Sequence, residues 1–442
     1  MTPGARIEAV IELCRLIDAT KQPADAVADR YFRERRFMGS KDRRAVADAT
    51  FAMLRRHARL DWWIARAGGA IEAAPRGRAL ANLVLFERTG PADLSALFSG
   101  TGHCPAPLSA DELAFAAALW EQPADHPEMP ATTTLELPAW LEEPLRRQWG
   151  AALATEMEAL NAPAPVDLRV NTLKATRGEA REILAADGIE TDPTPLSPLG
   201  LRAEGRPRLG GAEAFRRGLV EVQDEGAQVT ALLTGARPGM TVVDFCAGAG
   251  GKTLALAAAM TEGSRITGRL VACDTVAGRL KRMEGRLRRA GISGVKRRAL
   301  GAENDSWMLG NRASADRVLV DVPCSGTGTW RRHPEARWRL NAAEVDGHVR
   351  RQRRILAEAA ALVRKGGRLV YVTCSLLAAE NHERITGFLD DHPDFFLVPM
   401  AEAWAQSMGG PCPADGPTLT LSPARTGTDG FFAAVLERRA DK

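Results

Sequence analysis

The sequence has few cysteines, no long apolar run and no apolar segment near its first residue. The seven cysteines include no C-x-x-C pair, so the sequence predicts no disulfide framework and no metal site. No apolar run approaches the ~20 residues that a membrane span requires. Arg6 and Glu8 stand where a signal peptide would need an apolar core. We therefore expect a cytoplasmic protein with no membrane partner.

Charge of one sign is not in large excess, but its distribution is uneven. The formal net charge is only +4 over 442 residues. Arginines nevertheless gather in two blocks, 279–298 and 331–354. Basic surface of this kind is typical of proteins that bind a polyanion, although a solvated helix face is the alternative interpretation. At ~150 residues per domain, the chain is long enough for about three domains.

The patterning changes twice along the chain. Residues 1–130 repeat apolar positions at helical spacing and have few strand formers, which predicts an all-α domain. A proline-rich stretch at 121–134 is the candidate linker. Residues 135–220 mix helix and strand signals and predict a small α/β domain. From 221 to 442, strand and helix patterns alternate, which predicts a mostly parallel, doubly wound sheet.

Four polar side chains lie at or near the ends of predicted strands in this last region. They are Asp244, Asp274, Asp321 and Cys374. Because ligands of doubly wound sheets bind at the carboxyl ends of the strands, we expect these residues to converge on one crevice.

The stretch "DFCAGAGGKT" joins a predicted strand to a predicted helix and resembles two nucleotide-binding motifs without matching either. A P-loop needs glycine at the position of Cys246, and a dinucleotide fingerprint needs glycine at the position of Thr253. Asp274 ends the next strand, where an acidic residue accepts hydrogen bonds from ribose hydroxyls. The loop therefore predicts a nucleoside-type ligand more than a bound triphosphate.

Cys324 and Cys374 both follow apolar strands. Buried, inert thiols are the usual alternative for such residues. Their shared position at strand ends, with Asp321 nearby, favours chemistry instead, because a thiolate is a strong nucleophile. A thiolate that adds to carbon 6 of a pyrimidine activates carbon 5 for methylation, and a carboxyl group stabilises the developing charge. The residues alone leave open which cysteine attacks.

These motifs resemble those of the RsmB/NOP2/Sun family of RNA cytosine-C5 methyltransferases. The resemblance is carried by "DFCAGAGGKT", "DVPCSGTGTWRRHPEARW", "YVTCSLLAAEN", "VQDEGAQ" and "GTDGFFAAVL", and it covers residues 135–442. It implies a Rossmann-like class I methyltransferase fold with a seven-stranded, mostly parallel sheet. The helical N-terminal region resembles the NusB-like RNA-binding domain of bacterial members.

The resemblance also implies roles for individual residues. Cys374 would be the nucleophile, Cys324 would assist product release, Asp321 would bind the cytosine and support its protonation, and Lys252 would orient Asp321. S-adenosylmethionine would be the cofactor. Its implied binding residues are Cys246, Ala247, Gly248, Ala249, Gly250, Gly251, Lys252, Asp274, Arg279 and Asp321.

The sequence departs from the family pattern at two places. Ala249 replaces the loop proline, which predicts a less rigid loop. The acidic residue expected near the adenine is not identified, because Glu303, Asn304 and Asp305 are all candidates.

The implied substrate is an unpaired cytosine in RNA, with 16S ribosomal RNA as the first expectation and transfer RNA as the alternative. Trp330, Trp338 and His333 are candidates for stacking on a base, although core packing is the alternative for the tryptophans. A non-catalytic RNA-binding or ribosome-assembly factor is disfavoured, because it would not need Asp321 and both cysteines. We expect the protein to act as a monomer.

Overall fold

The computed structural model describes residues 1–67, 71–263, 265–301 and 305–441, and it divides into two compact units. The helical unit comprises Met1–Ala162 together with Trp330–Leu340. The sheet unit comprises Pro163–Thr329 and Asn341–Lys442. This division follows compactness, so the three functional domains predicted above, with boundaries at 130, 135 and 220, stay a prediction.

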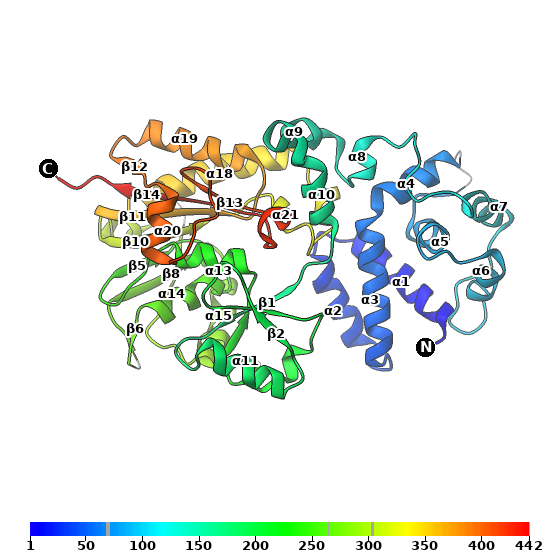
Figure 1. Cartoon of the computed structure of the whole chain (residues 1–442), viewed down its shortest axis with the longest axis horizontal. Helices are drawn as coiled ribbons and strands as arrows, with labels where there is room; N and C mark the ends of the chain where they lie inside the picture. Colours follow the sequence, from blue (N-terminus) through cyan, green and yellow to red (C-terminus); the bar gives the residue numbers. More distant parts are fainter. Residues whose placement is uncertain (68–70, 264, 302–304, 442) are drawn as a thin grey trace. The chain divides into compact units, whose positions relative to one another are not determined.

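The helical unit is built from short amphipathic helices, as its apolar spacing predicts (Figure 1). Their bounds are α1 Pro3–Asp18, α2 Ala24–Glu34, α3 Ser40–Arg55, α4 His57–Arg66, α5 Pro75–Leu85, α6 Pro91–Leu97, α7 Ala110–Leu119, α8 Ala131–Thr134, η1 Ala139–Leu141, α9 Glu142–Trp149, η2 Gly150–Ala152, α10 Leu153–Asn161 and α17 Ala336–Arg339. Across the described ranges, none of the helices is long and apolar enough to cross a membrane.

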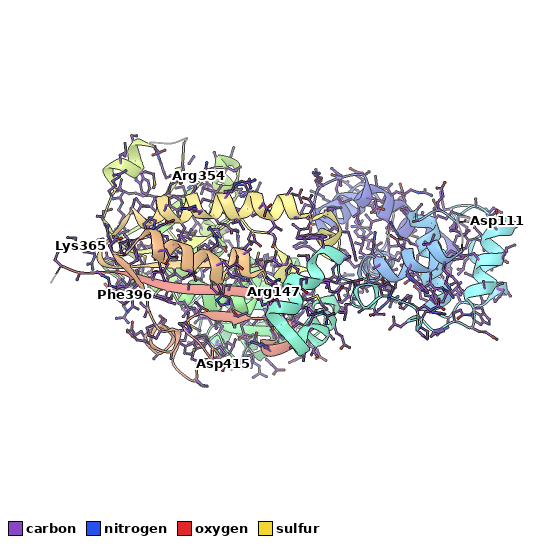
Figure 2. All side chains as sticks on the ribbon, turned by 90° about the horizontal axis from the view of Figure 1, so that it is seen from above. Asp111, Arg147, Arg354, Lys365, Phe396 and Asp415 are labelled. Atoms are coloured by element: carbon purple, nitrogen blue, oxygen red, sulfur yellow. The ribbon has the colours of Figure 1, made fainter. Side chains whose placement is uncertain are left out.

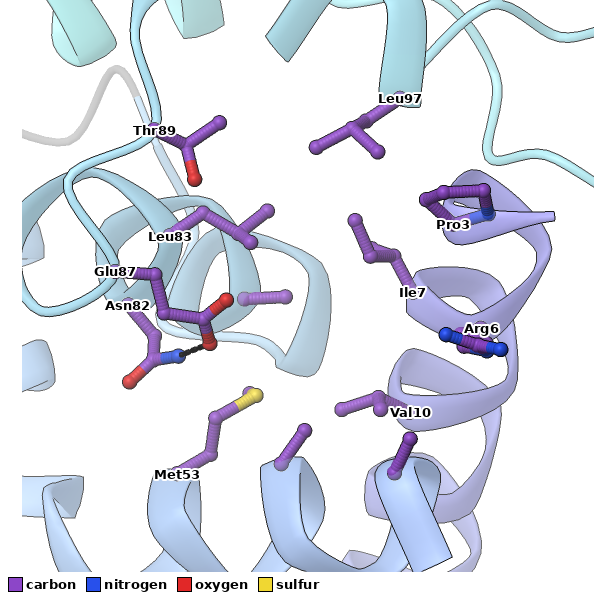
Figure 3. A pocket seen from close by; sticks show the side chains of 13 residues that line it. Pro3, Arg6, Ile7, Val10, Met53, Asn82, Leu83, Glu87, Thr89 and Leu97 are labelled. Atoms are coloured by element: carbon purple, nitrogen blue, oxygen red, sulfur yellow. Dashed lines mark hydrogen bonds between the residues drawn. The ribbon is translucent and has the colours of Figure 1, made fainter. Parts of the chain in front are cut away.

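Local sequence signals fix several helix ends in this unit. Thr2 accepts a hydrogen bond from Ala5 N at the start of α1, and Pro3 occupies the first turn. Ser109 and Glu112 form a reciprocal capping box at the start of α7. A pocket of 270 Å³ lies among these helices, lined by apolar side chains of α1, α3 and α5 and by the Asn82–Glu87 hydrogen bond (Figure 3).

The sheet unit is organised around one large, mostly parallel sheet. Its strand order is β12-β14-β11-β10-β5-β8-β9, and β13 pairs with β14 as an eighth strand beyond the predicted seven. The pairs β9–β8, β8–β5, β5–β10 and β10–β11 are parallel, whereas β14 is antiparallel to its neighbours. The strands are β5 Thr241–Asp244, β8 Arg269–Asp274, β9 Lys296–Ala299, β10 Ala315–Asp321, β11 Val363–Thr373, β12 Phe395–Leu397, β13 Leu419–Leu421 and β14 Phe431–Arg438.

Helices cover both faces of this sheet, because successive strand residues point to opposite sides (Figure 1). Val242 packs in one core cluster with α13, α14, α15 and α20, and Val243 packs in the other with α18 and α19. The helices that accompany the strands of this sheet along the chain are α13 Glu225–Leu232, α14 Gly251–Ala259, α15 Ala277–Ala290, α16 Ser306–Gly310, α18 Ala342–Ala360, α19 His382–Asp391, α20 Met400–Ser407 and α21 Pro423–Thr426, with 3-10 turns η4 Thr327–Thr329 and η5 Ala378–Glu380. The predicted doubly wound sheet is confirmed.

A second, antiparallel sheet lies in the same unit. Its order is β2-β3-β1-β4, and helices α11 and α12 share its core. The bounds are β1 Val166–Val170, α11 Arg177–Ala186, β2 Thr191–Pro193, β3 Gly200–Ala203, η3 Leu209–Gly211, α12 Glu213–Arg216 and β4 Val220–Val222; a hairpin of β6 Thr261–Glu262 and β7 Arg265–Ile266 stands apart.

One helix ends earlier than its sequence pattern predicts. The pattern favours a helix through residue 367, but α18 ends at Ala360 and β11 begins at Val363. Val363 pairs with Ala315, and the register shifts before the next pairs form. Gly366 has φ of +70°, a conformation that only glycine adopts without strain, and it allows the strand to continue past this irregularity.

Candidate active site

The glycine-rich loop turns the chain from β5 into α14. Phe245 N donates to Leu319 O at 2.8 Å and Ala247 N donates to Cys273 O at 2.8 Å, so both neighbouring strands hold the loop. Gly250 has φ of +86°, and a Cβ atom there would lie 2.4 Å from Met283 Cγ. The position therefore requires glycine both for its backbone conformation and for close packing against α15.

Asp274, at the end of β8, faces this loop. Its Oδ2 accepts from Gly248 N at 3.0 Å and its Oδ1 accepts from Val276 N at 2.7 Å. A carboxylate has about four acceptor positions, so capacity remains for two ligand hydroxyls. Arg279 lies 4.0 Å from the same carboxylate and is half-exposed, which makes it a weak partner.

Arginines from outside the loop hold the backbone at its irregular position, Ala249. Arg286 of α15 donates to Ala249 O at 2.9 Å and is also 3.1 Å from Glu221 of β4. Arg169 of β1 donates to Gly251 O at 2.7 Å, and burial lowers the pKa of this guanidinium to about 10, where it is still charged at neutral pH. Hydrogen bonds from outside the loop therefore hold its backbone at Ala249 and at Gly251.

Lys252 and Asp321 form an ion pair between α14 and the end of β10. Lys252 Nζ donates to Asp321 Oδ2 at 2.6 Å, which is the contact that the sequence resemblance implies. Burial alone would lower the pKa of Lys252, but the charge of Asp321 and its hydrogen bond raise this pKa above the usual value. The ammonium group therefore stays charged and orients the carboxylate.

The two cysteines of the strand ends lie in contact. Cys324 Sγ and Cys374 Sγ are 3.4 Å apart. Their proximity follows from the parallel register of β10 and β11, which pairs Asp321 with Val372. The hydrogen bond with Cys374, together with burial, raises the pKa of the Cys324 thiol well above its ordinary value.

A cavity of 1320 Å³ joins these groups at the carboxyl edge of the sheet. Its walls include the predicted site residues Cys246, Asp274, Arg279, Asp321, Cys324 and Cys374. Asp244 does not line it: this side chain is buried and accepts from Thr253 Oγ1 at 2.6 Å. Burial raises the pKa of Asp244 to about 7. The expected convergence therefore occurs for three of the four strand-end residues, and Asp244 instead supports α14.

Several expected binding residues shape the site without lining the cavity. The residues that form the turn into α14 and its first positions do not belong to the cavity walls: Ala247, Gly248, Ala249, Gly250, Gly251 and Lys252. Among the adenine candidates, Glu303 and Asn304 lie outside the described residues. Asp305 lines the cavity, and it also caps α16 by accepting from Trp307 N at 2.9 Å.

The expectation that Trp330 and Trp338 stack on a base is not supported. Trp330 has no exposed surface and packs in the helical unit with the Arg337 guanidinium 5.0 Å from its ring centroid. Trp338 stacks on His57 of the same unit, with ring centroids 5.0 Å apart. The base-stacking prediction is wrong for Trp330, because a fully buried indole has no free face.

Basic residues line part of the cavity wall, among them Arg312, His348, Arg351 and Arg354 (Figure 2 labels Arg354 on α18). The arginine-rich block 331–354 signalled Arg351 and Arg354 only as members of a group. Sequence reasoning missed His348 and also Arg312, which lies outside both blocks. Glu380 lies beneath both cysteine loops and is fully buried. It stands in the motif "YVTCSLLAAEN", but the sequence pattern assigns it no role and does not indicate its burial.

Two parts of the chain match described protein families. Residues 231–437 match the family described as 16S rRNA methyltransferase RsmB/F, and residues 137–208 match the RsmF/B-like ferredoxin-like domain. The ribosomal RNA small subunit methyltransferase B of Sodalis glossinidius is 35% identical over 302 residues, covering 68% of this chain and 65% of the relative. The probable enzyme of the same name from Synechocystis is 35% identical over 306 residues, covering 68% and 66%.

A solved structure extends the likeness to nearly the whole chain. The crystal structure of the protein PH0851 is 29% identical, covers 99% of both chains and has a TM-score of 0.79. The aligned part spans just under two thirds of the length of the two curated relatives, 65% and 66%. With a Rossmann-like sheet and matching sequence, residues 231–437 form a methyltransferase domain of the RsmB/F type, and residues 137–208 form the RsmF/B-like ferredoxin-like domain.

Proposed function

We propose that this protein is an S-adenosylmethionine-dependent RNA cytosine-C5 methyltransferase that acts on small-subunit ribosomal RNA. The observation that carries the proposal is the pair of thiols 3.4 Å apart in one cavity with Asp321, whose carboxylate accepts a hydrogen bond from Lys252 at 2.6 Å. Methylation of an amino group or a hydroxyl group needs no thiol, whereas carbon 5 of cytosine must first be activated by a nucleophile. The names of the curated relatives support the choice of ribosomal RNA.

The residues of the cavity fit the cofactor. The free acceptor positions of Asp274 suit two ribose hydroxyls, and at Gly248 no atom lies within 4 Å of the position that a Cβ atom would take, so the backbone there is open to a ligand. Cys246 and Arg279 would complete this binding wall. When bound, S-adenosylmethionine supplies a methyl group that is activated for transfer by its positive sulfur.

The remaining residues would act on the cytosine. The Cys374 thiolate adds to carbon 6, and carbon 5 becomes nucleophilic as the ring accepts the electron pair. Asp321, held by Lys252, binds the N3 and N4 edge and stabilises the charge that develops there. After carbon 5 has gained the methyl group it loses its proton, the bond to Cys374 breaks, and the ring regains its aromaticity. Cys324 would assist this release.

The test is bisulfite mapping of ribosomal and transfer RNA treated with the protein and the cofactor. We expect one protected cytosine in small-subunit ribosomal RNA, lost in Cys374→Ala. Cys324→Ala should accumulate a covalent protein–RNA adduct that resists denaturing electrophoresis. Protection confined to transfer RNA would reject the ribosomal substrate, and no protection in either RNA would reject the proposed chemistry.

A further inference from the structure

Glu380 is a fully buried carboxyl group to which the reaction scheme above assigns no role. It lies in η5, after the strand that delivers Cys374, and none of its surface is exposed. Its Oε1 accepts from Ser325 N and from Gln352 Nε2, each at 2.9 Å. Its Oε2 accepts from Ser325 Oγ and Ser375 Oγ, each at 2.5 Å. A buried carboxyl group with four donors is held firmly and holds those donors in turn.

The donors stand next to the two thiols in the chain. Ser325 follows Cys324, and Ser375 follows Cys374. One carboxyl group therefore links the two loops at the residues adjacent to the cysteines. Gln352 extends this link, because its Nε2 also donates to Pro323 O at 3.0 Å.

Backbone contacts complete the link between the loops. Gly328 N donates to Cys374 O at 2.9 Å, and Leu376 N donates to Thr327 Oγ1 at 2.8 Å. Gly328 and Gly430 also pack backbone to backbone, so that a Cβ atom on Gly328 would lie 2.2 Å from Gly430 O. The separation of the two sulfur atoms is therefore set by a network that Glu380 shares with both loops.

Charge near the thiols is unequal on the two sides. Lys252 interacts electrostatically with Cys374, and a negative charge on that sulfur contributes to the raised pKa of the lysine. Glu380 acts on Cys324: after the hydrogen bond with Cys374, burial and the charge of Cys374, its charge helps to raise the pKa of the Cys324 thiol. The cation Lys252 therefore stands on the Cys374 side of the pair, while the charge of Glu380 favours the protonated thiol on Cys324.

We propose that Glu380 is a positioning residue that fixes the two thiols against each other and makes Cys374 the more reactive one, with Cys324 as its hydrogen-bond donor. The consequence for methylation rests on the proposed function, but the inequality of the thiols does not. The inequality of the thiols also supplies a physical reason for assigning Cys374 as the nucleophile, a choice that the sequence pattern left open.

The first test measures the thiols without RNA or cofactor. Iodoacetamide alkylates thiolates by forming a carbon–sulfur bond as iodide leaves, and peptide mass spectrometry reports the rate at each cysteine. In the full-length protein we expect Cys374 to react at least tenfold faster than Cys324. In Glu380→Gln this ratio should fall at least threefold, because the charge is lost and an amide group replaces one acceptor.

Glu225→Gln is the matched control. Glu225 is also fully buried in the sheet unit, and its carboxylate accepts from Ser197 N at 2.8 Å, far along the chain from either cysteine loop. We expect this control to lower the unfolding temperature and to leave the alkylation ratio unchanged. An unchanged ratio in folded Glu380→Gln would overturn the proposal. If that variant does not fold, the Ser325→Ala/Ser375→Ala double variant replaces it, with the same expected fall and the same overturning outcome.

The second test follows turnover. Glu380→Gln should lower kcat at least tenfold and leave the Kd for S-adenosylmethionine within twofold. It should also raise the fraction of protein held as covalent RNA adduct at steady state, because release needs a correctly placed Cys324. Equal slowing of adduct formation and release would indicate a merely structural role and overturn the proposal. A changed alkylation ratio in a protein that methylates no cytosine would instead reject the proposed function and leave the thiol arrangement standing.

Discussion

Glu136 is a buried acid whose ionisation opposes folding of the helical unit. Its side chain is fully buried, and its carboxyl oxygens accept from Ala58 N at 2.8 Å and Arg59 N at 3.3 Å in the first turn of α4. Burial raises its pKa from 4.5 to about 7, although these hydrogen bonds and the nearby Arg337 act in the opposite direction. Between these two pH values, the Glu136 carboxyl group is ionised in the unfolded chain but stays protonated in the folded chain.

The sign of the resulting pH dependence follows from proton linkage. Because the folded state binds the proton more tightly, stability from Glu136 is present below pH 4.5 and is lost as the pH rises through 7. A shift of this size corresponds to about 3 kcal/mol. We expect Glu136→Gln, which keeps an acceptor oxygen but has no charge, to gain stability relative to the wild type as the pH rises.

Urea unfolding at pH 4.5, 6 and 8, followed by circular dichroism, measures this effect. The difference between Glu136→Gln and wild type should grow by about 3 kcal/mol across that interval. Other titrating groups, including the buried Asp244, are present in both proteins and cancel in the difference. A difference that is constant with pH would contradict the assignment.

The candidate site shows which residues can be predicted from sequence. Cys324, Cys374 and Asp321 were identified because strand ends and short motifs place reactive residue types at known points of a parallel sheet. Glu380 stands in the motif "YVTCSLLAAEN" but received no role, because its contacts with Ser325 and Ser375 and its burial have no local signature in the sequence. The stacking role of Trp330 was wrong for a related reason: its motif lies near the site in the chain but packs in the helical unit.

Helix α15 contributes two arginines that differ in what they hold. Arg286 and Arg289 both contact Glu221, at 3.1 and 2.6 Å, but only Arg286 also donates to Ala249 O in the glycine-rich loop. Hydrogen bonds from charged groups contribute about 1.5–3 kcal/mol. We expect Arg286→Gln to weaken S-adenosylmethionine binding about tenfold, since about 1.4 kcal/mol corresponds to that factor.

Isothermal titration calorimetry with S-adenosylmethionine checks this prediction, and Arg289→Gln is its control. The control loses an ion pair on the same helix but leaves the loop untouched, so its Kd should stay within twofold of the wild type. Equal weakening in both variants would show that Glu221, and not the loop carbonyl, is the important contact.

Helix α18 presents arginines of two kinds. Arg351 and Arg354 line the cavity, whereas Arg353 is 2.9 Å from Asp391 of α19 and is not part of the cavity wall. If RNA phosphates approach along this wall, each cavity arginine displaces counterions when RNA binds. We expect Arg351→Gln and Arg354→Gln each to reduce the slope of log affinity against log salt by about 0.7 for a single-stranded RNA.

Filter binding of a cytosine-containing RNA at four salt concentrations measures these slopes. Arg353→Gln changes the same formal charge on the same helix, and its slope should equal that of the wild type. A reduced slope in all three variants would indicate a diffuse field, with no phosphate contact specific to the cavity wall.

The strands of the large sheet could be predicted from the sequence, whereas the end of α18 at Ala360 could not. Apolar, β-branched runs such as 316–323 and 368–374 have no competing interpretation in an alternating pattern. The segment after Ala360 is different, because "LVRKGGRLVYV" begins with residues that suit a helix as well as a strand. This segment becomes a strand because Val363 pairs with Ala315, a residue distant in the sequence.

The chain passes from the sheet unit into the helical unit and back within a short segment. Trp330–Leu340 belongs to the helical unit, although the residues before and after it belong to the sheet unit. Arg339 donates to Ile17 O and Gln22 O, each at 2.8 Å, and Ala24 N at the start of α2 donates to Glu335 Oε1 at 2.9 Å. The helical unit is therefore complete only when a segment from the second half of the chain is in place.

We therefore expect a substitution at Trp330 to destabilise helices near the N-terminus. Trp330 is fully buried, so Trp330→Ala should cost the helical unit about 3–5 kcal/mol. Hydrogen exchange followed by mass spectrometry should show faster exchange in α2, which the segment contacts, and trypsin should cleave at Arg331 or Arg337 sooner than in the wild type. Trp140, 37% exposed in the same unit, provides the control, since Trp140→Ala should change neither measurement by more than a small amount. If Trp330→Ala altered exchange only in the sheet unit, the segment would not be an integral part of the helical bundle.

Faster exchange in α2 would mean instead that the two units cannot fold in strict succession along the chain. The helical unit, although it begins first, has to wait for residues of the segment that follows the Cys324 loop.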